Sequence, residues 1–369
     1  MKILIIAAAR PNFMKVAPII HALREAGRKD PGLEFRLIHT GQHYDPRMSD
    51  NFFSDLGLPM PDVNLEVGSG THAEQTGRVM MAFEKVCQET LPDWVVVVGD
   101  VNSTMACAIT AKKLGVKVAH VEAGLRSRDM SMPEEINRLC TDAISDLLFT
   151  TDRLADENLR CEGVAGERIR FVGNTMIDSL LRHLACARAL PLPAGLEAGR
   201  YAVATLHRPS NVDEKESLAG LIRCLADIAG RIPVVFPIHP RTRKNLREFG
   251  LQDEVAAADI RLLEPVSYVP FLGLLSHSRM VLTDSGGIQE ECTILGVPCL
   301  TLRNNTERPI TCEIGTNILV GTDPERIRRT AFQVLDGGAG RGQVPEKWDG
   351  GAAARIVDAL LAWPGAAKE

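Results

Sequence analysis

The chain has 369 residues, and its 47 acidic and 42 basic side chains give a formal net charge of −5. This length favours two domains with ample core, and the acidic balance argues against a nucleic-acid-binding protein. Nine cysteines are scattered along the chain, without a CxxC pair or a Cys/His cluster at zinc spacing. We therefore expect buried free thiols in a reducing cytosol.

The apolar run Ile3–Ala9 near the start of the chain is too short to span a membrane. No cleavage-like site follows it, and Arg10-Pro11-Asn12 instead indicates a turn from a strand into a helix. We therefore expect a cytoplasmic protein with no membrane partner.

Strand-like apolar runs alternate with amphipathic helical patterns from end to end, which predicts an α/β fold with doubly wound parallel sheets. The strands expected in the first half are Ile3–Ala8, Phe35–Thr40, Val95–Val98, Val116–Val121, Leu147–Thr150 and Ile169–Val172. The helices expected between them lie near Met14–Glu25, Pro46–Leu56, His72–Glu89, Asn102–Leu114, Glu134–Ser145 and Asp152–Cys161. For the helix at 102–114, Asn102 or Ser103 is the expected N-cap.

The second half repeats the alternation. Its expected strands are Tyr201–Thr205, Val234–Pro237, Ile260–Leu263, Met280–Thr283 and Cys299–Thr301. Its expected helices lie near Leu218–Ala229, Thr242–Phe249, Val269–Ser276, Gly287–Leu295 and Pro324–Leu335. Two doubly wound sheets facing each other would border a central cleft, which is a common place for a ligand.

The segment Leu184–Arg200 is rich in Pro, Gly and Ala and is the best candidate for a linker. The boundary could also lie earlier, near Gly173, where a helix over Met176–Leu184 begins. We expect domains at 1–175 and 176–350. A final helix, Ala352–Leu361 within 351–369, could pack on either half.

The stretch Val95–Arg138 carries the first candidate site. A strand, a helix and a second strand form a right-handed βαβ unit, which places Asp100 and Glu122 at the carboxyl edge of one sheet, where ligands bind. A third carboxylate, Glu134 or Glu135, follows. Such a group of carboxylates suits proton transfer. In the alternative interpretation Asp100 is a turn or cap residue, and Ser131 to Glu134 form a capping box.

The first βα turn lacks the glycine patterns of a dinucleotide site and of a P-loop, which disfavours a nicotinamide cofactor. Arg10 and Lys15 flank the start of a helix, where anions are favoured. Alternatively, Arg10 is solvated and Lys15 only lies on a helix face.

In the second half, a strand leads into Asp284-Ser285-Gly286-Gly287 and then a helix, and such a start exposes backbone N–H groups to a phosphate. Glu290 and Glu291 follow early in that helix. The alternative is a capped helix with acidic residues favoured by its dipole.

Two histidines, His207 and His239, follow successive strands and are candidates for acid/base chemistry or phosphate contact. A single turn histidine is more often satisfied by backbone, but the repeat weakens that interpretation. Phe271 belongs either to the core or to a base-stacking position. The loops Thr40–Tyr44 and Arg303–Pro309, with Arg308 in the second, could line a cleft.

Taken together, these motifs resemble the UDP-N-acetylglucosamine 2-epimerase family. The matching segments cover nearly the whole chain in order: ARPNFMKVAP at 9–18, TGQH at 40–43, GD at 99–100, HVEAGLRS at 120–127, PEEINR at 133–138, GNTMID at 173–178, HRPSN at 207–211, LTDSGGIQEE at 282–291 and TERP at 306–309.

The resemblance implies two Rossmann-like domains of the glycosyltransferase-B type, with the C-terminal helix crossing back to the first. It implies a nonhydrolysing epimerase that inverts C2 of UDP-N-acetylglucosamine by eliminating UDP and adding it back to a 2-acetamidoglucal. A cytoplasmic homodimer that serves cell-surface polysaccharide biosynthesis, without metal or other cofactor, is implied as well.

The resemblance also assigns site residues. The catalytic set that it implies is Asp100, Glu122, Glu134 and His207. The substrate-binding set that we expect is Arg10, Lys15, His239, Phe271, Ser285, Gly286, Glu291 and Arg308. Among these, Glu291 matches a position that holds ribose hydroxyls and Phe271 one beside uracil.

The chain also departs from many bacterial members of the family. It has HRPSN where they have HRREN-like sequences, and it lacks the later glutamines after Gln42-His43 that allosteric members use to bind a second UDP-sugar. A related branch with similar GTH and MPEEINR patterns epimerises UDP-2,3-diacetamido-2,3-dideoxy-glucuronate. That activity, a hydrolysing 2-epimerase, a glycosyltransferase of the same fold and a UDP-sugar-binding regulator are the alternatives.

Overall fold

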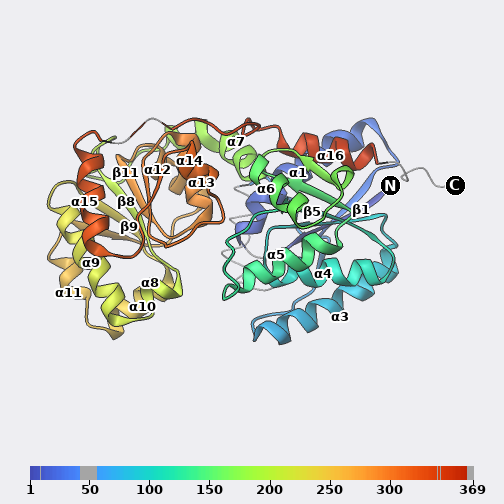
Figure 1. Ribbon diagram of the computed structural model, residues 1–369, viewed down its shortest axis with the longest axis horizontal. Coiled ribbons are helices and arrows are strands. Elements are labelled where there is room, and N and C mark those ends of the chain that lie inside the picture. Colours follow the sequence, from blue (N-terminus) through green and yellow to red (C-terminus); the bar gives the residue numbers. More distant parts are fainter. Residues whose placement is uncertain (9, 42–55, 339, 341, 364–369) are drawn as a thin grey trace. The chain divides into compact units, whose positions relative to one another are not determined.

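The computed structural model describes residues 1–8, 10–41, 56–338, 340 and 342–363, without the side chains of residues 10 and 11. The chain divides into two compact units, shown in Figure 1. The first unit comprises Met1–Ser179 and Glu346–Glu369, and the second comprises Leu180–Pro345. The expected helix Pro46–Leu56 lies outside the described residues except for Leu56.

The division between the units falls inside helix α7, Thr175–Ala189. The segment Leu184–Arg200, which composition indicates as a linker, therefore lies in the second unit, and its first residues are helical. The weak apolar periodicity of this segment reflects exposed helix and turns.

The first unit is built on a parallel sheet of seven strands in the order β3-β2-β1-β4-β5-β6-β7. The strands are β1 (Lys2–Ala7), β2 (Glu34–His39), β3 (Val63–Asn64), β4 (Trp94–Val98), β5 (Lys117–Ala123), β6 (Leu147–Thr150) and β7 (Ile169–Phe171). The helices are α1 (Arg10–Lys29), α3 (His72–Thr90), α4 (Asn102–Lys113), α5 (Pro133–Ile144), α6 (Arg153–Cys161), the short 3₁₀ helix at Gly166–Arg168, and α16 (Ala352–Leu361).

The second unit is built on a parallel sheet of six strands in the order β10-β9-β8-β11-β12-β13. The strands are β8 (Ala202–Thr205), β9 (Val234–Pro237), β10 (Ile260–Leu263), β11 (Met280–Thr283), β12 (Cys299–Thr301) and β13 (Asn317–Leu319). The helices are α8 (Pro209–Val212), α9 (Lys215–Ala229), α10 (Pro240–Glu248), α11 (Gln252–Ala256), α12 (Tyr268–Ser276), α13 (Gly286–Leu295), α14 (Ile310–Glu313) and α15 (Pro324–Leu335).

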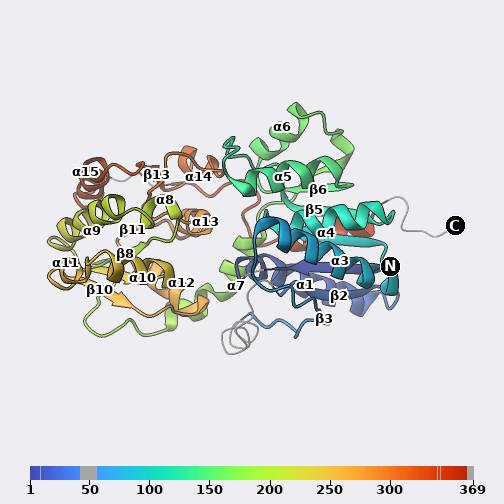
Figure 2. The same ribbon diagram turned by 90° about the horizontal axis from the view of Figure 1, so that it is seen from below.

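Both sheets have the doubly wound strand order, so the predicted α/β class with two Rossmann-like units is confirmed. The order reverses between β1 and β4 in the first sheet and between β8 and β11 in the second. Figures 1 and 2 show α3, α4 and α5 on one face of the first sheet and α1 with α16 on the other. Loops after β1, β4 and β5 therefore lie at one edge, which positions the first candidate site.

Each sheet is buried on both faces, which explains its continuous apolar strands. Val95–Val98 are all at most 1% exposed, and Val95 and Val97 pack in an apolar cluster with Phe83 of α3 and Ala106 of α4. Burying each such side chain stabilises the fold by about 1.5–3 kcal/mol.

All nine cysteines are free. Five of them are buried as expected, and burial raises the pKa of the Cys87 and Cys224 thiols to about 12. Three others, Cys140, Cys161 and Cys186, are exposed. The apolar character of their helices did not indicate this exposure. Within the described part of the chain, no helix is long and apolar enough to cross a membrane.

The expected cap of α4 is wrong. Helix α4 begins after Val101, which has no capping side chain, so neither Asn102 nor Ser103 is its N-cap. Helix α5 begins after Met132, again without a side-chain cap. The Ser131 hydroxyl donates to Asp129 Oδ1 at 2.6 Å, so the capping box of the alternative interpretation of Glu134 does not form.

The C-terminal segment docks on the first unit, where α16 lies beside α1 in Figure 1. The Trp348 indole N–H donates to the Thr151 carbonyl at 2.9 Å. The Asp178 carboxylate accepts the amides of Ala352 at 3.2 Å and Ala353 at 2.7 Å. Asp178 on α7 thus satisfies the first N–H groups of α16.

We predict a pH-dependent contribution of Asp178 to stability. Burial raises the pKa of this carboxyl to about 6, although the two amide hydrogen bonds oppose the rise. The folded protein therefore holds this proton more tightly than the unfolded chain, so the stability that the proton contributes is present below about pH 4 and is lost as the pH rises through about 6. Relative to Asp178→Asn, the wild type should lose stability on the order of 3 kcal/mol between pH 4 and 7.

All three tryptophans (Trp94, Trp348 and Trp363) lie in the first unit, so urea unfolding followed by tryptophan fluorescence measures this difference. Asp349→Asn is the matched control. Its hydrogen bonds with Arg355 lower the pKa of Asp349, so that variant should show a small trend of opposite sign. Parallel curves for the wild type and Asp178→Asn would contradict the prediction.

Candidate active site

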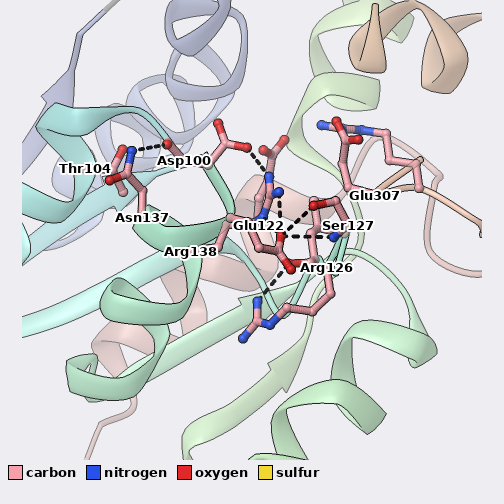
Figure 3. Close-up of polar contacts among 12 residues, drawn as sticks. Asp100, Thr104, Glu122, Arg126, Ser127, Asn137, Arg138 and Glu307 are labelled. Carbon is pink, nitrogen blue, oxygen red and sulfur yellow. Dashed lines mark hydrogen bonds and ion pairs between the residues drawn. The ribbon is translucent and has the colours of Figure 1, made fainter. Parts of the chain in front are cut away.

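The carboxyl edge of the first sheet brings Asp100 and Glu122 together. Asp100 follows β4, and Glu122 lies near the end of β5, whose residue Val121 pairs with Val98 of β4. Figure 3 shows both carboxylates beside Arg138 of α5. The predicted grouping of carboxylates at this edge is thus present within one unit.

Glu122 has an unusual backbone conformation. Its φ is +69°, in the left-handed region that side-chain-bearing residues rarely adopt, and the register of β5 against β6 shifts between Val121 and Ala123. A left-handed conformation costs roughly 1–2 kcal/mol for a residue other than glycine. Such a conformation turns the carboxylate away from the regular alternation of the strand and directs it to the sheet edge.

The Glu122 carboxylate is buried at 3% exposure and forms an ion pair with Lys15 of α1 through Oε2. Its other oxygen, Oε1, has no hydrogen-bond partner within the described residues. Lys15 is itself 9% exposed, so the two charges compensate each other away from water. Lys15, expected as an anion-binding residue, therefore supports a carboxylate in this structure.

The Asp100 carboxylate pairs with Arg138 Nη1, and its side chain is 28% exposed. Arg138 is 1% exposed and also donates to Glu135 Oε2 at 2.7 Å. The Glu135 carboxylate further accepts the amides of Ser127 at 3.0 Å and Arg128 at 2.9 Å. Burial alone would raise the pKa of Glu135, but these donors and Arg138 lower it overall.

The two candidates for the third carboxylate differ in their partners. Glu135 is engaged by a backbone loop and by Arg138, which indicates a structural role. Glu134 is half-buried in the first turn of α5 and has no hydrogen-bond or ion-pair partner among the described residues. Since the capping box does not form, Glu134 is the more available of the two.

The carboxyl edge of the second sheet brings His207 and Asp284 together, because β8 and β11 are neighbours. Asp284 is fully buried and accepts the amides of His207 at 3.0 Å and Arg208 at 2.9 Å. Its Oδ1 lies 2.8 Å from His207 Nδ1. Burial opposes ionisation, yet His207 and these amides hold the pKa of Asp284 below its ordinary value.

His207 is thereby oriented by a carboxylate, with Nδ1–H as the donor. Its side chain is 38% exposed, and Nε2 has no partner within the described residues. The His239 ring lies 5.9 Å from it between centroids. His239 Nδ1 accepts the Arg241 amide at 3.2 Å, and burial and the neighbouring His207 and Arg241 lower the pKa of His239.

The start of α13 is less open than the sequence indicates. The Ser285 amide donates to Thr283 Oγ1 at 3.0 Å, so it is not free for a phosphate. At Gly286 an added Cβ would lie 2.6 Å from Arg308 Nη1, so a side chain here would require Arg308 to shift. Arg308 forms ion pairs with Glu290 at 2.7 Å and Glu307 at 2.6 Å.

Two further candidates of the second unit are partly or wholly buried. Glu291 is 2% exposed, and burial raises its pKa to about 8, with the Tyr268 hydroxyl opposing the rise and Glu290 adding to it. Phe271 of α12 packs half-buried against the apolar cluster of Tyr201 and neighbouring residues. Their roles toward a ligand stay predictions.

Some expectations fall outside the described residues. They concern the side chain of Arg10 and residues 42–55, which include most of the loop Thr40–Tyr44 and of the helix expected at Pro46–Leu56. Among the residues that the structure describes, no group of three or more His, Cys, Asp or Glu side chains could hold a metal ion.

Sequence reasoning missed the partners of the candidate residues. Arg138 and Asp284 were not predicted as the residues that hold Asp100 and His207. The spacing of Glu135 and Arg138, three residues apart on one helix, could have indicated their pairing. No sequence pattern joins Asp284 to His207, because 77 residues separate them.

Two doubly wound sheets with polar side chains at each switch-point edge define the class of the protein: an enzyme of the glycosyltransferase-B type of fold. A family model described as UDP-N-acetylglucosamine 2-epimerase matches residues 25–361. The chain belongs to this family.

Known relatives agree with this assignment. The chain is 46% identical over 345 residues to the UDP-N-acetylglucosamine 2-epimerase of Methanocaldococcus jannaschii. The aligned residues cover 91% of this chain and 93% of that protein. It is 43% identical over 337 residues to the UDP-2,3-diacetamido-2,3-dideoxy-D-glucuronate 2-epimerase of Pseudomonas aeruginosa, covering 90% and 91% respectively. The crystal structure of the M. jannaschii enzyme with UDP-GlcNAc and UDP gives a TM-score of 0.88 at 43% identity, covering 98% of this chain and 100% of that chain.

We predict that Lys15→Met destabilises the first unit by about 3–5 kcal/mol, because it leaves the buried Glu122 carboxylate without its counter-charge. Adding Glu122→Gln to that variant should recover part of the loss. Urea unfolding followed by tryptophan fluorescence measures both.

Lys112→Met is the matched control for Lys15→Met. Lys112 pairs with Asp146 at 2.8 Å, but both side chains are about a third exposed, so solvent screens this pair. The control should lose much less stability, on the order of 1 kcal/mol. Equal losses for the two lysine variants would show that burial of the Glu122 pair has no special consequence.

Proposed function

We propose that this protein is a nonhydrolysing epimerase that interconverts UDP-N-acetylglucosamine and UDP-N-acetylmannosamine by inverting C2. The observation that carries the proposal is the Glu122 carboxylate. One of its oxygens is neutralised by Lys15, the other has no partner among the described residues, and Asp100 lies at the same sheet edge. A buried, directed carboxylate of this kind suits proton transfer at carbon.

The proposed reaction has two balanced steps. In the first, a carboxylate takes the proton from C2 while the C1–O bond to UDP breaks, which gives 2-acetamidoglucal and UDP. In the second, a UDP oxygen adds back to C1 and a proton is delivered to C2 on the opposite face. Two acid/base groups are therefore required, and Asp100, Glu122 and Glu134 are the candidates.

The departing UDP requires stabilisation of its diphosphate charge. We assign this role to the second unit, where His207 is oriented by Asp284 and presents Nε2. His239 lies beside it, and the helix α13 begins at Gly286, where remaining N–H groups favour an anion. In this division of labour the first unit holds the acid/base groups and the second unit binds UDP.

The relatives support the choice of substrate. The M. jannaschii enzyme is named for UDP-N-acetylglucosamine, and its structure contains that sugar nucleotide and UDP. The P. aeruginosa enzyme is named for a UDP-diacetamido-glucuronate and is nearly as similar to this chain. C2 epimerisation of that second sugar is therefore the alternative activity.

The decisive experiment incubates the wild type with each UDP-sugar in deuterated water and follows the products by NMR. We expect conversion of UDP-N-acetylglucosamine with one deuterium at C2, because the abstracted proton exchanges before its return. Conversion without deuterium would exclude the elimination route, and turnover of only the diacetamido sugar would favour the alternative. Release of UDP and free N-acetylmannosamine over time would indicate a hydrolysing enzyme.

We predict that Glu122→Gln reduces turnover at least 10²-fold, because a neutral amide cannot accept the C2 proton. UDP affinity, measured by calorimetry, should change by less than about threefold. Glu66→Gln is the matched control, since Glu66 is also a glutamate with positive φ in the first unit but is exposed. Near-normal turnover of Glu122→Gln would remove this residue from the acid/base set.

A further inference from the structure

A buried charge network lies directly behind the acid/base edge. His120 of β5 is fully buried, two residues before Glu122. Its Nδ1 lies 2.6 Å from Asp142 Oδ1, and its Nε2 lies 2.9 Å from the Gly99 carbonyl oxygen. Asp142 Oδ2 also pairs with Arg126 at 2.7 Å, and Arg126 pairs with Glu162.

Both ring nitrogens of His120 face hydrogen-bond acceptors. A carbonyl oxygen can only accept, so Nε2 must carry a hydrogen. The Asp142 carboxylate also accepts, since attraction to His120 and Arg126 outweighs the effect of burial and holds the pKa of Asp142 below its ordinary value. The His120 ring therefore joins Asp142 and the Gly99 carbonyl through its two nitrogens.

Asp142 binds the chain on both sides of Glu122. Its Oδ1 accepts from the side chain of His120, two residues before, and its Oδ2 accepts the amide of Gly124 at 3.0 Å, two residues after. Gly124 has a φ of +80°, so the backbone is left-handed at this residue as well as at Glu122. One carboxylate thus spans the irregular end of β5.

The same network reaches the residue before Asp100. The Gly99 carbonyl accepts from His120, and the Gly99 amide donates to the Val121 carbonyl at 3.0 Å. The backbone that leads into Asp100 is therefore bound through one buried ring to the backbone that carries Glu122. A shift of the ring would move both carboxylates.

We propose that Asp142 and His120 are positioning residues of the epimerase site, acting as a clamp that holds Glu122 in its left-handed conformation and fixes Gly99 ahead of Asp100. The clamp acts through backbone and does not touch the substrate. This inference rests on the proposed function, because it concerns the alignment of the acid/base pair. Misplacing a reacting group by about 1 Å can reduce a rate about 10²-fold.

The test compares Asp142→Asn with Asp146→Asn. Asp146 also binds β5, through the Val118 amide at 2.8 Å, but at the end of the strand away from Glu122. For Asp142→Asn we expect kcat to fall about 10- to 100-fold, with KM and the Kd of UDP within about twofold of wild type. For Asp146→Asn we expect lower stability by tryptophan fluorescence but kcat within about twofold of wild type.

Several outcomes overturn the proposal. A folded Asp142→Asn with wild-type kcat does so, and so does an equal fall in kcat for both aspartate variants, since that would reflect general destabilisation. If Asp142→Asn does not fold, His120→Gln replaces it: glutamine can still donate to Gly99 but lacks the second ring nitrogen that meets Asp142. A tenfold loss of kcat with retained UDP affinity supports the clamp, and an unchanged kcat overturns it.

The wild-type reaction separates this inference from the proposed function. If the wild type converts no UDP-2-acetamido sugar, the proposed function fails whatever the variants do. If the wild type incorporates deuterium at C2 and Asp142→Asn does so at the same rate, only the clamp fails. A crystal structure of Asp142→Asn gives a readout without turnover: we expect φ of residue 122 to leave the left-handed region, and an unchanged φ would overturn the clamp.

Discussion

The ion pair between Lys15 and Glu122 joins the first helix of the chain to the irregular end of β5, and the candidate site of the first unit depends on it. A carboxylate at 3% exposure without a counter-charge would be costly, and Lys15 compensates that charge through one oxygen only. The second oxygen stays available for chemistry. The same residue has a left-handed backbone, so local conformation, burial and charge coincide at Glu122.

The two units use a similar device for different purposes. In each, a buried aspartate accepts from a histidine Nδ1 and from backbone at a strand end: Asp142 from His120 and one amide, and Asp284 from His207 and two amides. His120 has both nitrogens engaged and no exposure, so it can act only through the groups that it binds. His207 is 38% exposed with Nε2 available, so it can meet a ligand. The second partner of the ring thus decides which histidine is open to a ligand.

The period and length of apolar runs made the fold largely predictable from the sequence. The strands missed in each sheet, β3 and β13, have only two and three residues, although β7 and β12 are as short as β13 and were predicted. The capping box at Ser131 failed because the Asp129 carboxylate competes for the hydroxyl, and the apparent linker proved partly helical. Local composition does not show which of several nearby hydrogen-bond partners a polar side chain selects.

The candidate site was predictable only in part, for a related physical reason. Position at a strand end follows from topology, so Asp100, Glu122 and His207 could be placed at sheet edges from the sequence. Whether a side chain or amide is free to meet a ligand depends on hydrogen-bond and ion-pair partners that the local sequence does not show. Ser285 was expected to offer an amide to a phosphate and Arg308 to bind substrate, yet the amide is bound to Thr283 and the guanidinium to two glutamates. Glu134 and Glu135, adjacent and chemically alike, differ because a loop and Arg138 engage only the second, and the first keeps its carboxylate without a partner among the described residues.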